Sequence, residues 1–236
     1  MKETNKTKAA LVTGASSGIG KEITKIFLKK GIPVIGIGRH FSDDQNHPLF
    51  HGIIFDLKKT SQIPELIRQI RKDFEIQYLV NNAGVGYFGL HEELNPAKIH
   101  EMISVNLEAP LILSQLLLRD LKKNKGTILT ISSITAQKNS PHGCAYGATK
   151  AALTSFSKSL FEESRKYGVK TICIHPDMTQ SNFYRNADFK EGSSPDSYLL
   201  ASEIAETISW ILSARDGMVI SEVTIQPQKH QLGKKL

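Results

Sequence analysis

Apolar runs alternate with helix-period segments along the whole chain. Seven short runs are nearly continuous in apolar and β-branched residues, which predicts buried strands at 9–14, 32–38, 51–57, 78–84, 126–133, 169–176 and 219–227. Between them, apolar residues recur every three or four positions, which predicts helices at 18–31, 61–74, 96–123, 202–214 and around residue 146 to about 167. Strands that are apolar on both faces and alternate with helices are typical of a covered parallel sheet.

Right-handed crossovers between such strands give an α/β fold, namely a doubly wound, mostly parallel seven-stranded sheet with helices on both faces. No linker, repeat or composition break divides the chain, so residues 1–236 are predicted to form a single domain with a short lid segment at about 178–198. Only about a dozen residues separate Arg39 from His51, so we expect an irregular crossover instead of a helix there.

Composition is that of a globular protein with a sizeable core: 236 residues, 40% apolar and 22% charged. No long apolar stretch follows the polar N-terminus, so we expect neither a signal peptide nor a membrane span, and we predict a cytoplasmic protein. Cys144 and Cys173 lack metal-ligand spacing and are predicted to be reduced and buried. No metal site is expected.

The net charge is +7, and much of the basic excess lies near the two ends of the chain, at Lys2, Lys6, Lys8, Lys229, Lys234 and Lys235. These residues are interpreted as solvated tails, because no basic face with stacking aromatic residues or a reading helix accompanies them. Nucleic acid is therefore not an expected partner. A mildly positive field would help to attract an anionic dinucleotide.

The run TGASSGIG at residues 13–20 follows the first predicted strand and opens the first helix. Glycine permits a tight turn and a close approach of backbone to a pyrophosphate, and the helix N-terminus presents free N–H groups to it. A glycine-rich turn that merely ends a strand is the alternative. In this strand–turn–helix context we predict dinucleotide contacts from Thr13, Gly14, Ser16, Ser17, Gly18, Ile19 and Gly20.

Arg39 follows the second strand, where an NAD-preferring site would usually carry an acidic residue for the ribose. A guanidinium suits a 2′-phosphate, so NADP(H) is favoured and NAD(H) remains open; an exposed loop arginine is the alternative. Asp56, next to Leu57, is predicted to accept a hydrogen bond from the adenine amino group or to cap the helix that begins near Ser61.

Tyr146 and Lys150 are four residues apart on a predicted helix, so they share one face, and Ser133 lies thirteen residues before the tyrosine. A nearby ammonium favours the phenolate and should lower the pKa of Tyr146. A tyrosine brought toward neutral pH can give or take a proton in a reaction.

These motifs resemble those of the short-chain dehydrogenase/reductase family, in its order and spacing and over nearly the whole chain. They are TGxxxGxG at 13–20, NNAG at 81–84, Asn106 in SVN, Ser133, and YxxxK at 146–150. The resemblance implies a Rossmann-like fold and hydride transfer between a nicotinamide and an alcohol or carbonyl carbon. The expected activity is an NADPH-dependent reduction of a small or medium carbonyl compound, whose identity and physiological direction the motifs leave open.

By the same resemblance, Tyr146 is the general acid/base, Ser133 polarises the carbonyl oxygen, and Lys150 bonds the nicotinamide ribose. Asn106 would anchor a water that passes protons to solvent. The other cofactor contacts that the resemblance implies are Asn82, Ala83, Gly84, Pro176, Thr179 and Ser181. Each residue singly has an ordinary structural alternative, but the alternatives are improbable jointly.

Two segments depart from the family pattern or stay undecided. Asp177 follows Pro176 where the family usually has glycine, and Asp adopts positive φ less readily than Gly does. In the lid, the aromatic side chains Phe183, Tyr184 and Phe189 could form an apolar cover, while Arg185 or Lys190 could meet an anionic substrate.

The helix at 96–123 is apolar on more than one face, as in a buried helix or one shared with another subunit. By resemblance, it and the helix with the Tyr–Lys pair form a two-fold interface, so a homodimer or homotetramer is expected. The alternative function is a catalytically silent dinucleotide-binding regulator or scaffold, but the retained Tyr146 and Lys150 disfavour it.

Overall fold

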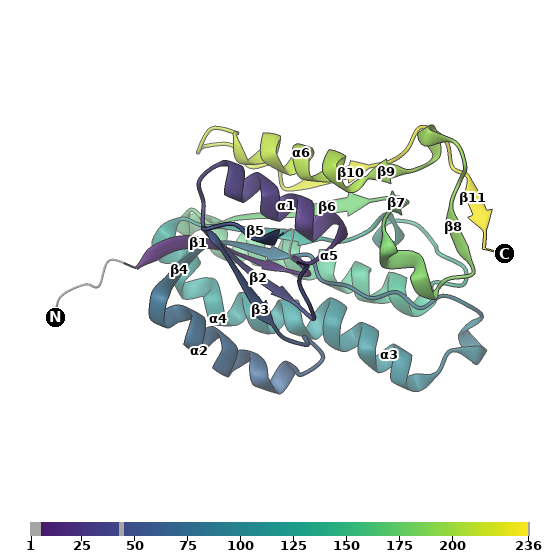
Figure 1. Ribbon diagram of the computed structural model, residues 1–236, viewed down its shortest axis with the longest axis horizontal. Coiled ribbons are helices and arrows are strands. Elements are labelled where there is room, and N and C mark those ends of the chain that lie inside the picture. Colours follow the sequence, from purple (N-terminus) through teal and green to yellow (C-terminus); the bar gives the residue numbers. More distant parts are fainter. Residues whose placement is uncertain (1–5, 43–44, 236) are drawn as a thin grey trace.

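The computed structural model describes residues 6–42 and 45–235, and one seven-stranded sheet forms its centre (Figure 1). All strand pairs in it are parallel, in the order β3-β2-β1-β4-β5-β6-β10. The strands are β1 (Thr7–Thr13), β2 (Val34–Gly38), β3 (Phe50–Ile54), β4 (Phe74–Asn81), β5 (Thr127–Ile131), β6 (Lys170–Pro176) and β10 (Glu222–Ile225). The predicted doubly wound fold is confirmed.

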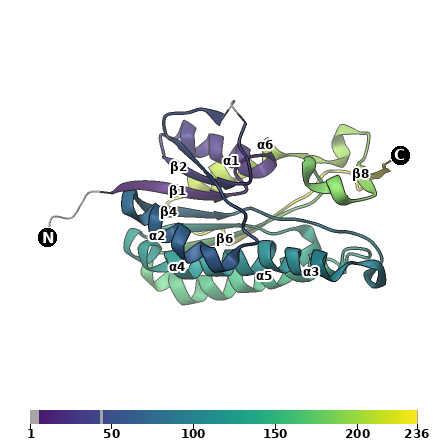
Figure 2. The same ribbon diagram turned by 60° about the horizontal axis from the view of Figure 1, so that its bottom comes forward.

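Helices cover both faces of the sheet, as Figure 2 shows. On one side lie α1 (Gly18–Lys29) and α6 (Ala201–Leu212), and on the other α2 (Ile63–Asp73), α3 (Pro96–Ile103), α4 (Ala109–Asn124) and α5 (Cys144–Ser164). Successive strand residues point to opposite faces, so Leu11 packs in the core under α2 and α4, whereas Val12 packs in the core under α1 and α6. This alternation explains why both faces of β1 had to be apolar.

The order of strands creates a crevice at the carboxyl ends of β1 and β4. The chain leaves β1 through α1 toward β2, and it leaves β4 through α3 and α4 toward β5 on the opposite face. Because these two connections diverge from neighbouring strands, side chains cannot fill the space between them, and ligands of doubly wound sheets bind at this point.

The helix predicted at 96–123 is interrupted, because a π-helical turn, Ser104–Glu108, separates α3 from α4. Pro110 explains the interruption: it has no N–H for the carbonyl of Asn106, and its ring crowds that carbonyl. The widened turn brings Asn106 to a fully buried position.

The stretch Pro96–Asn124 is the one helical stretch in the described part of the chain that is, by length and composition only, long and apolar enough to cross a membrane. This corrects the expectation that no stretch would reach that length. Half of its most apolar window is buried inside the structure. Leu113, Leu117 and Leu121 of the stretch lie in the core. Burial of this kind is typical of a helix that packs in the core of a folded protein.

Several local details differ from the sequence prediction. No α-helix joins β2 to β3 in the residues described there, as expected, and Gln45 lies in a 3₁₀ turn. Asp43 and Asp44 lie outside the described residues, and so does Lys2 of the basic N-terminal end. Cys144 is exposed, contrary to prediction, and Cys173 is buried. Two small strand pairs were not predicted: β7 (Thr179–Gln180) with β9 (Leu199–Leu200), and β8 (Phe189–Glu191) with β11 (Leu232–Lys234).

Candidate active site

A cleft runs along the crevice from the glycine-rich turn to the N-terminal half of α5. Most of the predicted site residues line it: Gly14, Ser16, Ser17, Gly18, Ile19, Arg39, Asp56, Leu57, Asn82, Ala83, Gly84, Ser133, Tyr146, Lys150, Pro176, Thr179 and Ser181. Thr13, Gly20 and Asn106 lie behind this lining and shape it through their contacts.

Thr13 ties the ends of β1 and β4 together. Its buried hydroxyl donates to the carbonyl of Val80 at 3.0 Å and accepts from the backbone N–H groups of Asn82 and Ala83, each at 3.0 Å. In return, the Asn82 side chain donates to the carbonyls of Thr13 at 2.9 Å and Gly14 at 3.3 Å. The two loops that form the floor of the cleft are therefore held in one register.

The glycine-rich turn fits a dinucleotide pyrophosphate. Gly14 has a φ of 67°, and a Cβ on Gly20 would lie 2.2 Å from the carbonyl oxygen of Gly14, so only glycine lets α1 start this close to the strand. No side chain caps the helix at Ser17, and no acidic residue lies in its first turn. The first-turn N–H groups and the positive end of the helix dipole thus suit an anion.

Arg39 lines the same end of the cleft as Ser16 and Asp56. The Asp56 carboxylate accepts from the N–H of Lys58 at 3.0 Å, which stabilises its own turn. The helix after it begins at Ile63 without a side-chain cap. The alternative prediction, that Asp56 caps this helix, is therefore wrong.

At the other end of the cleft, β5 and α5 bring Ser133, Tyr146 and Lys150 together. Their side chains are all largely buried. Ser133 lies close enough to Tyr146 for its hydroxyl to lower the pKa of the phenol, and Ser133 Oγ accepts from the N–H of Thr135 at 3.2 Å. Lys150 Nζ lies 5.8 Å from the centre of the Tyr146 ring and donates to the carbonyl of Ile131 at 2.8 Å, which leaves two of its donors for a ligand.

The predicted lowering of the Tyr146 pKa is wrong for this structure. Burial raises the pKa of Tyr146, the nearby Tyr184 raises it further, and the hydrogen bond with Ser133 offsets only part of this. Burial also lowers the pKa of Lys150, to about 8. Desolvation thus opposes the charged form of both groups.

Asn106 holds the loop that follows β4. Its Oδ1 accepts from the N–H of Val85 at 2.8 Å, and its Nδ2 donates to the carbonyl of Val85 at 2.9 Å and to Thr149 Oγ1 at 3.1 Å. These bonds join the π-helical turn, the loop with Asn82 and Gly84, and α5. The predicted water contact stays a prediction, whereas the positioning role is visible here.

Aromatic rings close over Tyr146. Phe88 and Phe183 lie 5.4 and 5.5 Å from its ring centre, and Phe88 in turn contacts Tyr184 and Phe189. Burial raises the pKa of the Tyr184 phenol as well. We call these five residues the aromatic cluster.

Of the two open alternatives for the lid, the apolar cover is the one that the structure shows. Arg185 also lines the cleft. Sequence reasoning missed Phe88 of the cluster, and it missed Glu101, which lines the cleft and accepts from the Tyr87 hydroxyl at 2.9 Å. Phe88 could have been found from the sequence, because it is an aromatic residue close after the NNAG motif. No sequence pattern pointed to Glu101.

Asp177 needs no strained backbone. Only Lys125 and His142 have positive φ among the non-glycine residues described. The Asp177 carboxylate accepts from the N–H of Met178 at 2.8 Å and from Gln226 Nε2 at 3.2 Å, so it stabilises the turn after β6.

Comparison with known proteins agrees with this geometry. A family described as short chain dehydrogenase matches residues 8–191. An uncharacterized oxidoreductase of Staphylococcus epidermidis is 30% identical over 230 residues, covering 94% of this chain and 98% of that protein. An alcohol dehydrogenase of the archaeon Thermococcus sibiricus, solved with 5-hydroxy-NADP, has a TM-score of 0.84 and 27% identity over 96% of this chain and 98% of its own. A 4-hydroxyisoleucine dehydrogenase with NADH and succinate has a TM-score of 0.82 and 25% identity over 92% and 97%.

Removing the buried ammonium should stabilise the protein. The pKa of Lys150 is about 8 here against an ordinary 10.5, so Lys150→Met should raise the free energy of unfolding by about 3 kcal/mol near neutral pH. The cost of burying the charge is complete below about pH 8 and disappears by about pH 10.5, when the lysine is neutral in both states. Urea unfolding of both proteins across this pH range measures the difference, and a constant difference would contradict the assignment.

Proposed function

Because the chain belongs to the short-chain dehydrogenase family of NAD(P)-dependent oxidoreductases acting on CH–OH groups, we propose that it reduces a small or medium carbonyl compound with NADPH. The observation that carries the proposal is the placement of Ser133, Tyr146 and Lys150 at one end of a cleft whose other end holds the glycine-rich turn and Arg39.

A bound nicotinamide would supply the hydride, and the chain supplies the proton and the orientation. The carbonyl oxygen of the substrate would lie against the hydroxyls of Ser133 and Tyr146, both of which can donate to it. Since burial raises the pKa of Tyr146, the phenol is protonated and ready to give its proton as negative charge develops on that oxygen. The ammonium of Lys150 then stabilises the phenolate, and its free donors suit the nicotinamide ribose.

The preference for NADPH rests on Arg39, which lines the cleft just after β2. A guanidinium pairs with a phosphate through two parallel hydrogen bonds, whereas a ribose hydroxyl gives it no charged partner. Relatives of known structure bind either nucleotide, so the family alone does not decide this point.

The substrate end of the cleft is lined by apolar and aromatic side chains, among them Val85, Val105 and Phe183. The lid segment at about 178–198 is short, and the aromatic cluster packs against Tyr146. We therefore propose a small or medium substrate with an apolar body. A cytoplasmic location stays a prediction.

Tyr146→Phe should keep the nucleotide site and lose the reaction. The ring stays in the aromatic cluster, but the proton donor is gone, so turnover should fall by about 10²–10⁴-fold. NADPH affinity by fluorescence titration and NADPH oxidation with small ketones and aldehydes measure the two properties. Unchanged turnover would remove Tyr146 as the acid, and loss of nucleotide binding would point to damage of the fold.

Arg39→Ala should weaken NADPH binding by at least about tenfold, because it removes a charged hydrogen-bond partner of the 2′-phosphate, and should leave NADH binding unchanged. Arg68→Ala, an exposed arginine of α2 outside the cleft, is the control. Titration of each variant with NADPH and with NADH measures whether Arg39 is responsible for a preference for NADPH. Parallel losses for NADPH and NADH, or none, would make Arg39 an ordinary surface charge.

We also propose a homodimer or homotetramer that uses the outer faces of α4 and α5. Both helices keep partly exposed apolar residues, including Ile112, Leu116 and Phe156. Light scattering at micromolar concentration should give a multiple of 26.2 kDa, and a monomer mass would refute the assembly.

A further inference from the structure

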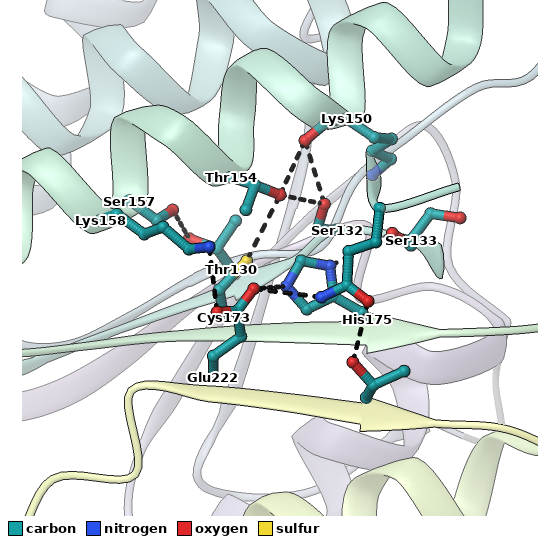
Figure 3. A network of polar contacts seen from close by, with 12 residues as sticks. Thr130, Ser132, Ser133, Lys150, Thr154, Ser157, Lys158, Cys173, His175 and Glu222 are labelled. Carbon is teal, nitrogen blue, oxygen red and sulfur yellow. Dashed lines mark hydrogen bonds and ion pairs between the residues drawn. The ribbon is translucent and has the colours of Figure 1, made fainter. Parts of the chain in front are cut away.

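A fully buried histidine stands behind the candidate serine (Figure 3). His175 is on β6, one residue before Pro176, with none of its surface exposed. Its Nδ1 lies 3.2 Å from the backbone oxygen of Ser133, and its Nε2 lies 2.7 Å from Oε1 of Glu222 on β10. The imidazole therefore bridges the loop after β5 and the last strand of the sheet.

Both groups that face the imidazole are acceptors. A carbonyl oxygen has no proton to give, so the contact with Ser133 requires a proton on Nδ1. The carboxylate contact lies away from the in-plane N–H direction and is an ion pair more than an aligned hydrogen bond. A carboxylate oxygen 2.7 Å from Nε2 is attracted to the delocalised positive charge of a ring that is protonated on both nitrogens, and a neutral ring offers it no such charge.

Glu222 is the ionised partner. Lys158 Nζ lies 3.0 Å from its Oε2, and Gln137 Nε2 donates to its Oε1 at 3.2 Å. Burial alone would raise the pKa of Glu222, but these hydrogen bonds and the charge of His175 outweigh it, and the pKa lies below its ordinary value. Glu222 is therefore the carboxylate, ionised member of this pair.

We propose that His175 is held as an imidazolium by Glu222, and that it is a positioning residue which fixes the Ser133 peptide so that the Ser133 hydroxyl meets Tyr146. The role of Ser133 rests on the proposed function. The charge of the imidazolium rests on the contacts alone, so it can be tested without a substrate.

The Ser133 peptide needs such a support because it ends a strand. Ser133 is in extended backbone, with φ −165° and ψ 158°, and a short 3₁₀ turn, Ile134–Ala136, follows at once. Its carbonyl accepts from the N–H of Ala136 at 3.0 Å on the loop side and from His175 on the sheet side. Rotation of this peptide would carry Ser133 Oγ away from Tyr146.

The far end of the loop after β5 is held by β10, the strand that carries Glu222. Gln137 donates to Glu222 and accepts from Thr224 Oγ1 at 3.1 Å, so β10 holds the loop at two places. The other charged or titratable groups in this network are Lys158 and Lys150 on α5 and Cys173 on β6. Burial raises the pKa of the Cys173 thiol to about 11, so the thiol is neutral and adds no charge near neutral pH.

Three substitutions separate charge from shape. Glu222→Gln removes the counter-ion, so the buried imidazolium should lose a proton and with it one of its two contacts. His175→Asn places a neutral amide donor near the position of Nδ1. His175→Leu removes both contacts. Thr171→Val is the matched control, since Thr171 is buried on the same strand and its hydroxyl has no partner in the described structure.

Two-bond ¹H–¹⁵N spectra of the histidine rings measure the protonation of the His175 imidazole. The signals that are present in the wild type and absent in His175→Asn are those of His175. Near neutral pH the wild-type ring should show two protonated nitrogens, and Glu222→Gln should show one. The amide of Ile134 reports the Ser133 peptide in the same samples, and it should shift in Glu222→Gln and His175→Leu but not in Thr171→Val. A neutral ring in the wild type would overturn the proposal.

Turnover tests the positioning, with diacetyl and NADPH as the probe. His175→Leu should lower kcat by at least about tenfold with little change in KM, the loss expected for one hydrogen bond to a charged donor. His175→Asn should retain most of kcat.

The outcomes also separate this inference from the proposed function. If Tyr146→Phe abolishes turnover while His175→Leu and Glu222→Gln match the wild type, the proposed reaction stands and the positioning role is wrong. If no variant or wild type turns over the probe, the proposed reaction fails for that substrate, and the ring spectra with the Ile134 shift still decide whether the imidazolium holds the Ser133 peptide.

Discussion

The cleft depends on the bonding of one buried hydroxyl. Thr13 accepts two backbone N–H groups from the loop after β4 and donates to the carbonyl of Val80, at the point where the connections diverge. The N–H of Asn82 and the carbonyl of Val80 also bond to each other, at 3.1 Å, but without Thr13 the N–H of Ala83 would lose its bond, at a cost of about 1–3 kcal/mol. Because the register of β1 and β4 is held here, the glycine-rich turn and the loop with Asn82 keep the distance that a dinucleotide needs.

The reacting end of the cleft is governed by burial. Desolvation raises the pKa of Tyr146 and lowers that of Lys150, so burial makes the charged form of each group less stable than it is in water. The protein therefore carries a cost in stability to hold an acid and a cation in an apolar place, a pattern that is common where groups take part in chemistry. A nearby ammonium is favourable for the phenolate only once negative charge forms, which is when a proton donor needs it.

Residues outside the lining of the cleft hold its side chains in position. The π-helical turn before Pro110 places Asn106 against Val85, and β6 and β10 place His175 and Glu222 behind Ser133. On the substrate side, β8 carries Phe189 of the aromatic cluster and is paired with β11 near the end of the chain. Each support joins segments that are distant in sequence, so the geometry of the site belongs to the whole fold.

The sequence by itself determined the α/β class, the seven strands and most of the cleft lining, because these follow from local periodicity and from motifs such as YGATK whose members are near neighbours. Tertiary structure alone decided the sign of the Tyr146 pKa shift, since burial depends on Phe88, Phe183 and Tyr184 closing around it from other segments. It also decided the pairing of His175 with Glu222 and the place of Glu101. These contacts join residues far apart along the chain, and neither spacing nor hydrophobic period carries information about which distant side chains will meet.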